Sequence, residues 1–187
     1  ITPDHLDRYD YKLENYARSK MRITQNQTTA DHFIYSADDP VTQQMLDQMD
    51  DDLRARQLPF AINTAIASGD GDAVLEGHIF TASVGNKQVT IDTRKMQIQG
   101  MHNIYNAMAA ALATLAAGVD AKVIKRSIYE FSPVEHRLEP AGSKDDIEWI
   151  NDSKATNVDS VWYALESMQR PTVWIAGGTD KGNDYAP

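Results

Sequence analysis

The sequence has 187 residues, of which 42% are hydrophobic and 24% charged, a composition typical of a folded globular protein. Its net charge of −9 argues against a broad nucleic-acid or anionic-membrane surface, and the absence of cysteine excludes disulfides, thiolate metal sites and a cysteine nucleophile. No apolar run approaches the roughly 20 residues of a membrane span, and no segment resembles a signal peptide. The absence of cysteine is compatible with the cytoplasmic location that we expect. The chain opens at Ile1 without an initiator methionine and closes after a loop-like motif, which we interpret as a fragment of a longer protein.

The predicted elements alternate between helices and strands along the chain. In chain order they are a helix over residues 11–23, a strand over 33–36, a polar helix over 41–54, a strand pair or small meander over 73–91, helices over 101–118 and 120–131, a strand over 147–151, a helix over 158–168 and a strand over 172–176. Pro133 breaks the helical pattern and makes residues 132–137 a linker. We therefore expect an α/β fold that ends in a β–loop–α–β unit.

Lys20 is the first residue whose position suggests chemistry. The apolar stripe of the first helix runs through Leu13, Tyr16 and Ala17, and the same spacing predicts that Lys20 lies on the buried side. Burial destabilises the charged form of a lysine, and a neutral amine can react with carbon dioxide to form a carbamate, which is a ligand for hard metals. The simpler interpretation is that the long stem carries the amine to water.

His5 lies fifteen positions before Lys20, in a loop that also contains Asp4 and Asp7. On its own it is interpreted as a surface histidine beside two solvated carboxylates. Its other possible role is that of a metal ligand or a phosphate neighbour. Because Mg²⁺ takes few protein ligands and keeps phosphates and waters, one imidazole and one carbamate beside a triphosphate are compatible with an open Mg²⁺ site.

Two asparagines and one arginine are candidates for nucleotide contacts. Asn103 and Asn106 lie three residues apart at the start of the alanine-rich helix and share a face, where their amides match the hydrogen-bonding edge of adenine. Capping of the helix by Asn103 is the alternative. Arg137, in the predicted linker, is a strong bidentate donor to phosphate or carboxylate, or else forms a surface salt bridge with Glu135 or Glu139.

The loop at residues 151–157 is the most informative segment, because seven polar or small residues separate a predicted strand from a predicted helix. Open α/β sheets bind ligands where a strand passes through such a loop into a helix. Asp152 and Lys154 supply an anion and a cation, and Thr156 lies at a helix start whose free N–H groups attract anions. A capped, solvated turn requires the same residue types, and this interpretation stays open for the loop alone.

The order and spacing of these motifs resemble the Mur ligase family over essentially the whole chain. The resemblance is carried by residues 4–9, Lys20, residues 100–107, His136 with Arg137, residues 151–157 and residues 177–184. The family has three domains. The resemblance implies that residues 1–135 are the C-terminal part of the central P-loop-type ATPase domain, and that residues 136–187 begin a Rossmann-like C-terminal domain that binds the incoming amino acid.

The run Asn-Asp-Ser-Lys-Ala-Thr-Asn is characteristic of the family member that adds D-glutamate to UDP-N-acetylmuramoyl-L-alanine. The resemblance implies a monomeric, ATP- and Mg²⁺-dependent amide ligase of peptidoglycan precursor synthesis that acts through an acyl phosphate. It assigns His5 and a carbamylated Lys20 to the metal, Asn103, Asn106, Arg137 and Asp152 to ATP, Lys154 to the reacting phosphate, and Thr156 and Lys181 to the carboxylates of D-glutamate. We expect the chain alone to be inactive, because the family's phosphate-binding loop is absent from it.

Three other interpretations stay open. Another Mur-type or folylpolyglutamate-type ligase, with a different amino acid, would share most of these motifs. A dinucleotide-binding oxidoreductase domain would use residues 177–182 as its glycine-rich loop, but the spacing there does not match G-x-G-x-x-G. The third is a fold unit that binds nothing in isolation.

Overall fold

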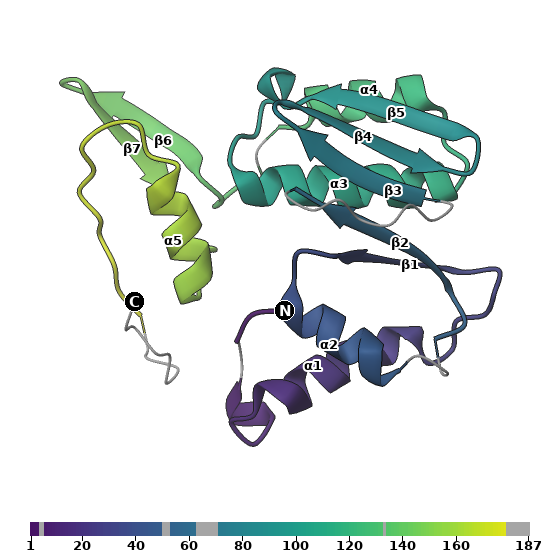
Figure 1. Cartoon of the computed structure of the whole chain (residues 1–187). Coiled ribbons are helices and arrows are strands. Elements are labelled where there is room, and N and C mark those ends of the chain that lie inside the picture. The colour runs from purple at the N-terminus through teal and green to yellow at the C-terminus, as the bar shows by residue number, and fades with distance from the viewer. Residues whose placement is uncertain (4–5, 50–52, 63–70, 133, 179–187) are drawn as a thin grey trace.

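The computed structural model describes residues 1–3, 6–49, 53–62, 71–132 and 134–178. The elements form two units: a five-stranded sheet with its helices, and a smaller unit made of a β-hairpin and one helix (Figure 1). Within these residues no helix has the length and apolar character needed to cross a bilayer.

The larger unit is built on a mixed sheet. Its strands are β1 (His32–Ser36), β2 (Arg56–Ala61), β3 (Gly71–Glu76), β4 (Ile79–Val84) and β5 (Lys87–Asp92), in that order across the sheet. β2 lies parallel to both β1 and β3, whereas β3, β4 and β5 form an antiparallel meander. The predicted meander is confirmed and contains three strands; β2 was missed.

Two tight turns set the register of the meander. Gly77, between β3 and β4, and Gly85, between β4 and β5, have φ of 59° and 58°. These values fall in the left-handed region that glycine adopts at little cost and that two-residue hairpin loops require. The resulting register pairs Phe80 with Ile91, and both side chains are completely buried.

Helices pack on the sheet and beside its first strand. They are α1 (Leu13–Met21), α2 (Pro40–Gln48), α3 (Met101–Ala116) and α4 (Ala121–Glu130). α3 contacts all five strands, and its buried residues Met108, Ala111, Leu112 and Leu115 recur at helical spacing, as an amphipathic helix requires. α4 packs on β5 and begins at Asp120, whose carboxylate accepts a hydrogen bond from the Lys122 N–H at 2.8 Å.

β1 separates two apolar clusters because its side chains alternate between faces. Ile34 packs against the cluster formed with α3, whereas Phe33 belongs to a second cluster with Met21 of α1 and Met45 of α2. The predicted strand at 33–36 and the two predicted helices on either side of it are thus confirmed, although α2 ends at Gln48.

The prediction that Lys20 lies on the buried side of α1 is wrong. The buried residues of this helix are Ala17 and Met21, and Thr24 in the following turn is also buried. The apolar stripe therefore advances by four and then three residues from Ala17 and leaves Lys20 at its edge. Lys20 is exposed, and its amine lies 5.0 Å from the ring centroid of Tyr16.

The smaller unit consists of β6 (Glu139–Lys144), β7 (Ile147–Asn151) and α5 (Val158–Glu166). β6, which was missed, pairs antiparallel with β7 across a turn at Asp145 and Asp146, whose φ values are 52° and 61°. Asn157 caps α5 by accepting a hydrogen bond from the Ser160 N–H at 2.8 Å. The predicted strand at 147–151 and the predicted helix after it are confirmed.

The predicted strand at 172–176 is wrong. This segment has no regular structure, and Val173, Trp174 and Ile175 are 90%, 60% and 79% exposed. A strand needs a neighbour for its backbone hydrogen bonds, and neither described sheet includes this segment. The smaller unit is therefore a hairpin, a loop and a helix in place of the expected β–loop–α–β arrangement.

Candidate functional site

One carboxylate joins the ends of the two parallel strands to α3. Asp38 follows β1 and accepts hydrogen bonds from the Ile62 N–H after β2, at 2.7 Å, and from the Tyr105 hydroxyl on α3, at 2.8 Å. The carboxyl ends of parallel strands are where open α/β sheets bind ligands. Asp38 thereby fixes the helix turn that carries Asn103 and Asn106 at this edge of the sheet.

The hydroxyl of Tyr105 is held in its protonated form. Its pKa is raised above the ordinary value of 10, first because burial disfavours the phenolate and then because Asp38 accepts its proton in a hydrogen bond. The raised pKa means that the folded state favours the neutral phenol.

Tyr105→Phe is expected to lower the free energy of unfolding by about 1 kcal/mol at neutral pH, because Asp38 loses a donor. Since folding raises the pKa of Tyr105, the wild-type protein is more stable than Tyr105→Phe below about pH 10, and this difference in the free energy of unfolding decreases above that pH. Urea unfolding of both proteins at neutral pH and at about pH 11 measures this difference. Tyr11→Phe, at a tyrosine that is 73% exposed, is the control, and equal stabilities of Tyr105→Phe and wild type at neutral pH would contradict the prediction.

Asn103 does not cap α3. The N-cap residue is Gly100, and the Asn103 amide donates to the Gln99 carbonyl at 2.7 Å. The capping alternative is therefore wrong, and the side chain instead secures the loop that enters the helix. Asn106 lies one turn further along the same helix and is exposed.

His102, for which the sequence predicted no role, faces the smaller unit from the first turn of α3. Its ring centroid lies 5.8 Å from that of Tyr163 on α5, and its Nδ1 atom is buried without a hydrogen-bond partner in the described structure. Burial lowers the pKa of His102, the charge of Asp152 opposes this shift, and the charge of Arg137 adds to it. The loops that carry Arg137 and Asp152 thus lie within electrostatic range of the start of α3.

The linker before β6 and the loop after β7 are tied together. Two hydrogen bonds connect them: Leu138 N–H to Asp152 Oδ1 at 3.1 Å and Lys154 N–H to the His136 carbonyl at 3.1 Å. A third, from Asn151 Nδ2 to Glu139 Oε2 at 3.1 Å, joins the adjoining ends of β7 and β6. These bonds place Arg137, Asp152 and Lys154 in one cross-linked pair of loops.

The charged and hydroxyl side chains of these loops are accessible to a ligand. Arg137, Lys154 and Thr156 are exposed, and Thr156 lies just before the α5 cap. Within the described residues no ion pair joins Arg137 to Glu135 or Glu139, so the salt-bridge alternative is wrong. The predicted residues His5 and Lys181 lie outside the described part of the chain.

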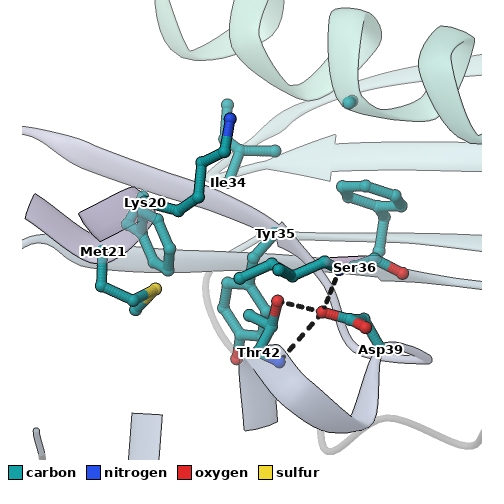
Figure 2. A pocket seen from close by; sticks show the side chains of 11 residues that line it. Lys20, Met21, Ile34, Tyr35, Ser36, Asp39 and Thr42 are labelled. Atoms are coloured by element: carbon teal, nitrogen blue, oxygen red, sulfur yellow. Dashed lines mark hydrogen bonds and ion pairs between the residues drawn. The ribbon is translucent and has the colours of Figure 1, made fainter. Parts of the chain in front are cut away.

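Lys20 lies outside these loops, beside a cavity of about 330 Å³ that is lined by residues of α1, β1 and α2, by Phe60 of β2 and by Ala109 of α3. Figure 2 shows its amine directed away from Asp39 and Thr42, which hydrogen-bond to each other at the start of α2. All residues that line this cavity belong to the larger unit. Arg137 and Asp152 therefore lie near the first turn of α3, whereas Lys20 lines a cavity that reaches Ala109, further along the same helix.

The described residues contain no group of three or more His, Cys, Asp or Glu side chains that could hold a metal ion. An amine such as that of unmodified Lys20 is also a poor ligand for Mg²⁺, which prefers oxygen. His5, the other predicted metal ligand, lies outside the described residues.

Residues 1–114 match the family model described as the Mur ligase middle domain. The chain belongs to the Mur ligase family. Among relatives, it is 47% identical over 185 residues to a UDP-N-acetylmuramoylalanine–D-glutamate ligase of Christiangramia forsetii and 44% identical over 187 residues to one of Bacteroides fragilis. Each match covers 99% of this chain and 40% of the relative, so the chain spans about two-fifths of the length of these Mur ligases.

Solved structures of Mur-type ligases share the fold. A pseudomurein peptide ligase type C from Methanothermus fervidus superimposes with a TM-score of 0.66 at 20% identity, over 90% of this chain and 40% of that one. MurF from Acinetobacter baumannii superimposes with a TM-score of 0.63 at 21% identity, over 89% of this chain and 35% of that one. The mixed α/β architecture is therefore that of the family.

Proposed function

We propose that this chain is part of an ATP-dependent ligase that joins D-glutamate to UDP-N-acetylmuramoyl-L-alanine in cytoplasmic peptidoglycan precursor synthesis. The observation that carries the proposal is the 47% identity, over 99% of the chain, to a relative named for this substrate and amino acid. ATP would phosphorylate the substrate carboxylate, and the D-glutamate amine would then attack the acyl phosphate. Phosphate leaves as the amide bond forms.

The two structural units support a domain boundary near residue 135. In this proposal residues 1–135 belong to the central ATP-binding domain, and residues 136–187 begin the amino-acid-binding domain. The match to the middle-domain model ends at residue 114, before the linker. A nucleotide held between the two domains would therefore contact both units.

The junction of α3 with the two loops has the chemistry of a nucleotide site. Asn103 and Asn106 supply amides for the base, and Arg137 supplies a guanidinium suited to phosphate. Asp152 supplies a carboxylate that can accept hydrogen bonds from ribose hydroxyls. The buried, unpartnered Nδ1 of His102 lies at the same junction, which supports the presence of a polar ligand there.

Phosphoryl transfer depends on positioning and on neutralising charge. We assign Lys154 to the transferred phosphate, because it is exposed on the loop that hydrogen-bonds to the Arg137 turn. Thr156, beside the N-terminus of α5, and Lys181 are assigned to the two carboxylates of D-glutamate, where a hydroxyl and a cation are suitable partners. The amine and the acyl phosphate would then meet at the same loop.

Lys20 is assigned as a carbamylated residue that supports Mg²⁺ together with His5. Carbamylation converts the amine into a carboxylate-like group, whose oxygens suit a hard cation. Bound Mg²⁺ would neutralise phosphate charge. In the isolated chain we expect Lys20 to be unmodified, because the bound Mg²⁺ and phosphate that would favour a carbamate are missing.

The test is a ligation assay with the full-length protein, ATP, UDP-N-acetylmuramoyl-L-alanine and a panel of amino acids. We expect amide product and ADP in equal amounts with D-glutamate, and no product with L-glutamate or with the 187-residue chain alone. Product formation with another amino acid in preference to D-glutamate would favour another Mur-type or folylpolyglutamate-type ligase.

A further inference from the structure

The turn that carries Arg137 contains an unusual backbone. His136 and Leu138, the residues on either side of it, have φ of 67° and 46°. Residues with a side chain rarely adopt this left-handed conformation, and for a bulky residue such as leucine it is an outlier. Such a conformation persists only where the surrounding structure holds it, and it is concentrated at functional sites.

Glu139 contacts His136, the first of the two left-handed residues, through both its backbone and its ring. Its Oε2 atom accepts the His136 N–H at 2.8 Å and the Asn151 amide at 3.1 Å, and lies 3.6 Å from His136 Nδ1. The same Asn151 amide is 2.8 Å from His136 Nδ1. One carboxylate thus joins the linker turn, the start of β6 and the end of β7.

Further hydrogen bonds connect the turn that carries Arg137 to the loop that carries Lys154. The Leu138 N–H donates to Asp152, and the Lys154 N–H donates to the carbonyl of His136, the residue that Glu139 binds. The exposed side chain of Arg137 takes no part in these contacts within the described structure. The network therefore fixes the backbone on both sides of Arg137 and leaves its guanidinium directed to solvent.

We propose that Glu139 is a positioning residue that clamps the turn at residues 134–138 onto the loop at residues 151–154, so that Arg137 and Lys154 act as one preformed site for nucleotide phosphates. This inference rests on the proposed function, because the phosphates are those of ATP. Glu139 itself does not touch the nucleotide: a carboxylate facing phosphate would repel it. Its carboxylate instead accepts hydrogen bonds from His136 and Asn151.

The first test measures ATP affinity by calorimetry in the full-length protein. Glu139→Ala is expected to raise the Kd for ATP by about tenfold to a hundredfold, because misplacement of a binding group by about 1 Å has effects of that size. Glu139→Gln, which keeps an acceptor oxygen, should show a smaller rise. Glu135→Ala removes a neighbouring exposed carboxylate and should leave the Kd unchanged.

The second test asks whether Glu139 acts through Arg137 and Lys154. In a background that carries both Arg137→Ala and Lys154→Ala, Glu139→Ala is expected to change the Kd for ATP by less than about twofold, since mutations that act through the same groups are not additive. A purely structural role would give the same loss in both backgrounds and would overturn the proposal. An unchanged Kd for ATP in Glu139→Ala would also overturn it.

Hydrogen exchange separates this proposal from the ligase assignment. In Glu139→Ala the amides of His136, Leu138 and Lys154 should exchange faster, while those of α3 keep their protection and report an intact fold. If wild-type protein fails to add D-glutamate, the proposed function fails, but ATP affinity and exchange still decide the role of Glu139. Unchanged exchange at these amides would show that the clamp does not depend on Glu139.

Discussion

Lys20→Ala is expected to reduce the turnover of the full-length enzyme by about a hundredfold to a thousandfold, the usual loss when a preorganised group at a transferring phosphate is removed. A short carboxylic acid added to the assay should restore part of this activity, because it can occupy the position of the missing carbamate. Initial rates of product formation, with and without added acetate, measure both effects.

The control for this prediction is Lys122→Ala, which removes an exposed lysine from α4 and should leave turnover unchanged. Carbamylation forms a bond between the lysine nitrogen and the carbon of carbon dioxide, and a proton passes to solvent. Full turnover in Lys20→Ala would remove this role. If Lys20→Ala loses activity and added acetate restores none of it, Lys20 is needed for turnover, but a carboxylate-like function is contradicted.

Thr156→Ala and Lys181→Ala are expected to raise the KM for D-glutamate by about tenfold or more and to change the KM for ATP much less. A hydrogen bond to a charged group contributes about 1.5–3 kcal/mol, which corresponds to this range of affinity. Steady-state kinetics with each substrate varied in turn measure the two constants.

Ser153→Ala is the matched control for Thr156→Ala, because it removes a hydroxyl from the same loop and Ser153 uses its backbone N–H to bond Asn151. It should leave both constants unchanged. Equal increases of the KM for ATP and the KM for D-glutamate in Thr156→Ala would mean that Thr156 only maintains the structure of the loop. D-glutamate would then be bound elsewhere.

The confirmed elements are those with a clear period in the sequence. The alternation over residues 73–91 predicts the meander, and the alanine-rich run over residues 101–118 predicts α3. β2 was missed because it is a central strand with four consecutive buried residues, so it does not alternate, and it contains Pro59. β6 was missed because Pro140 and Gly142 are rare in strands.

The wrong predictions for Lys20 and for residues 172–176 both come from reading a local apolar pattern. The stripe assigned to α1 included Tyr16 and Lys20 in place of Met21, and a shift of one position on a helix moves a side chain by about 100°. The apolar run at 172–176 has the composition of a buried strand, but strand formation depends on a partner that a local pattern does not specify.

Much of the candidate site depends on contacts that a sequence pattern does not report. Asp38 and Tyr105 are 67 residues apart, and neither was a candidate. The role of Glu139 follows from the left-handed backbone at His136 and Leu138. A sequence indicates this conformation only where it has glycine or asparagine, and neither residue stands at these two positions. The asparagines of α3 and the polar loop at 151–157 are candidates because their residue types suit a ligand.

The most direct test of the account is hydrogen exchange of the full-length protein with and without a non-hydrolysable ATP analogue, because the central claim is that α3 and the two loops share one nucleotide. We predict slower exchange in the bound state at residues 101–107 of the larger unit and at both 134–139 and 151–157 of the smaller one. Protection confined to one unit, or found only at other segments, would contradict it.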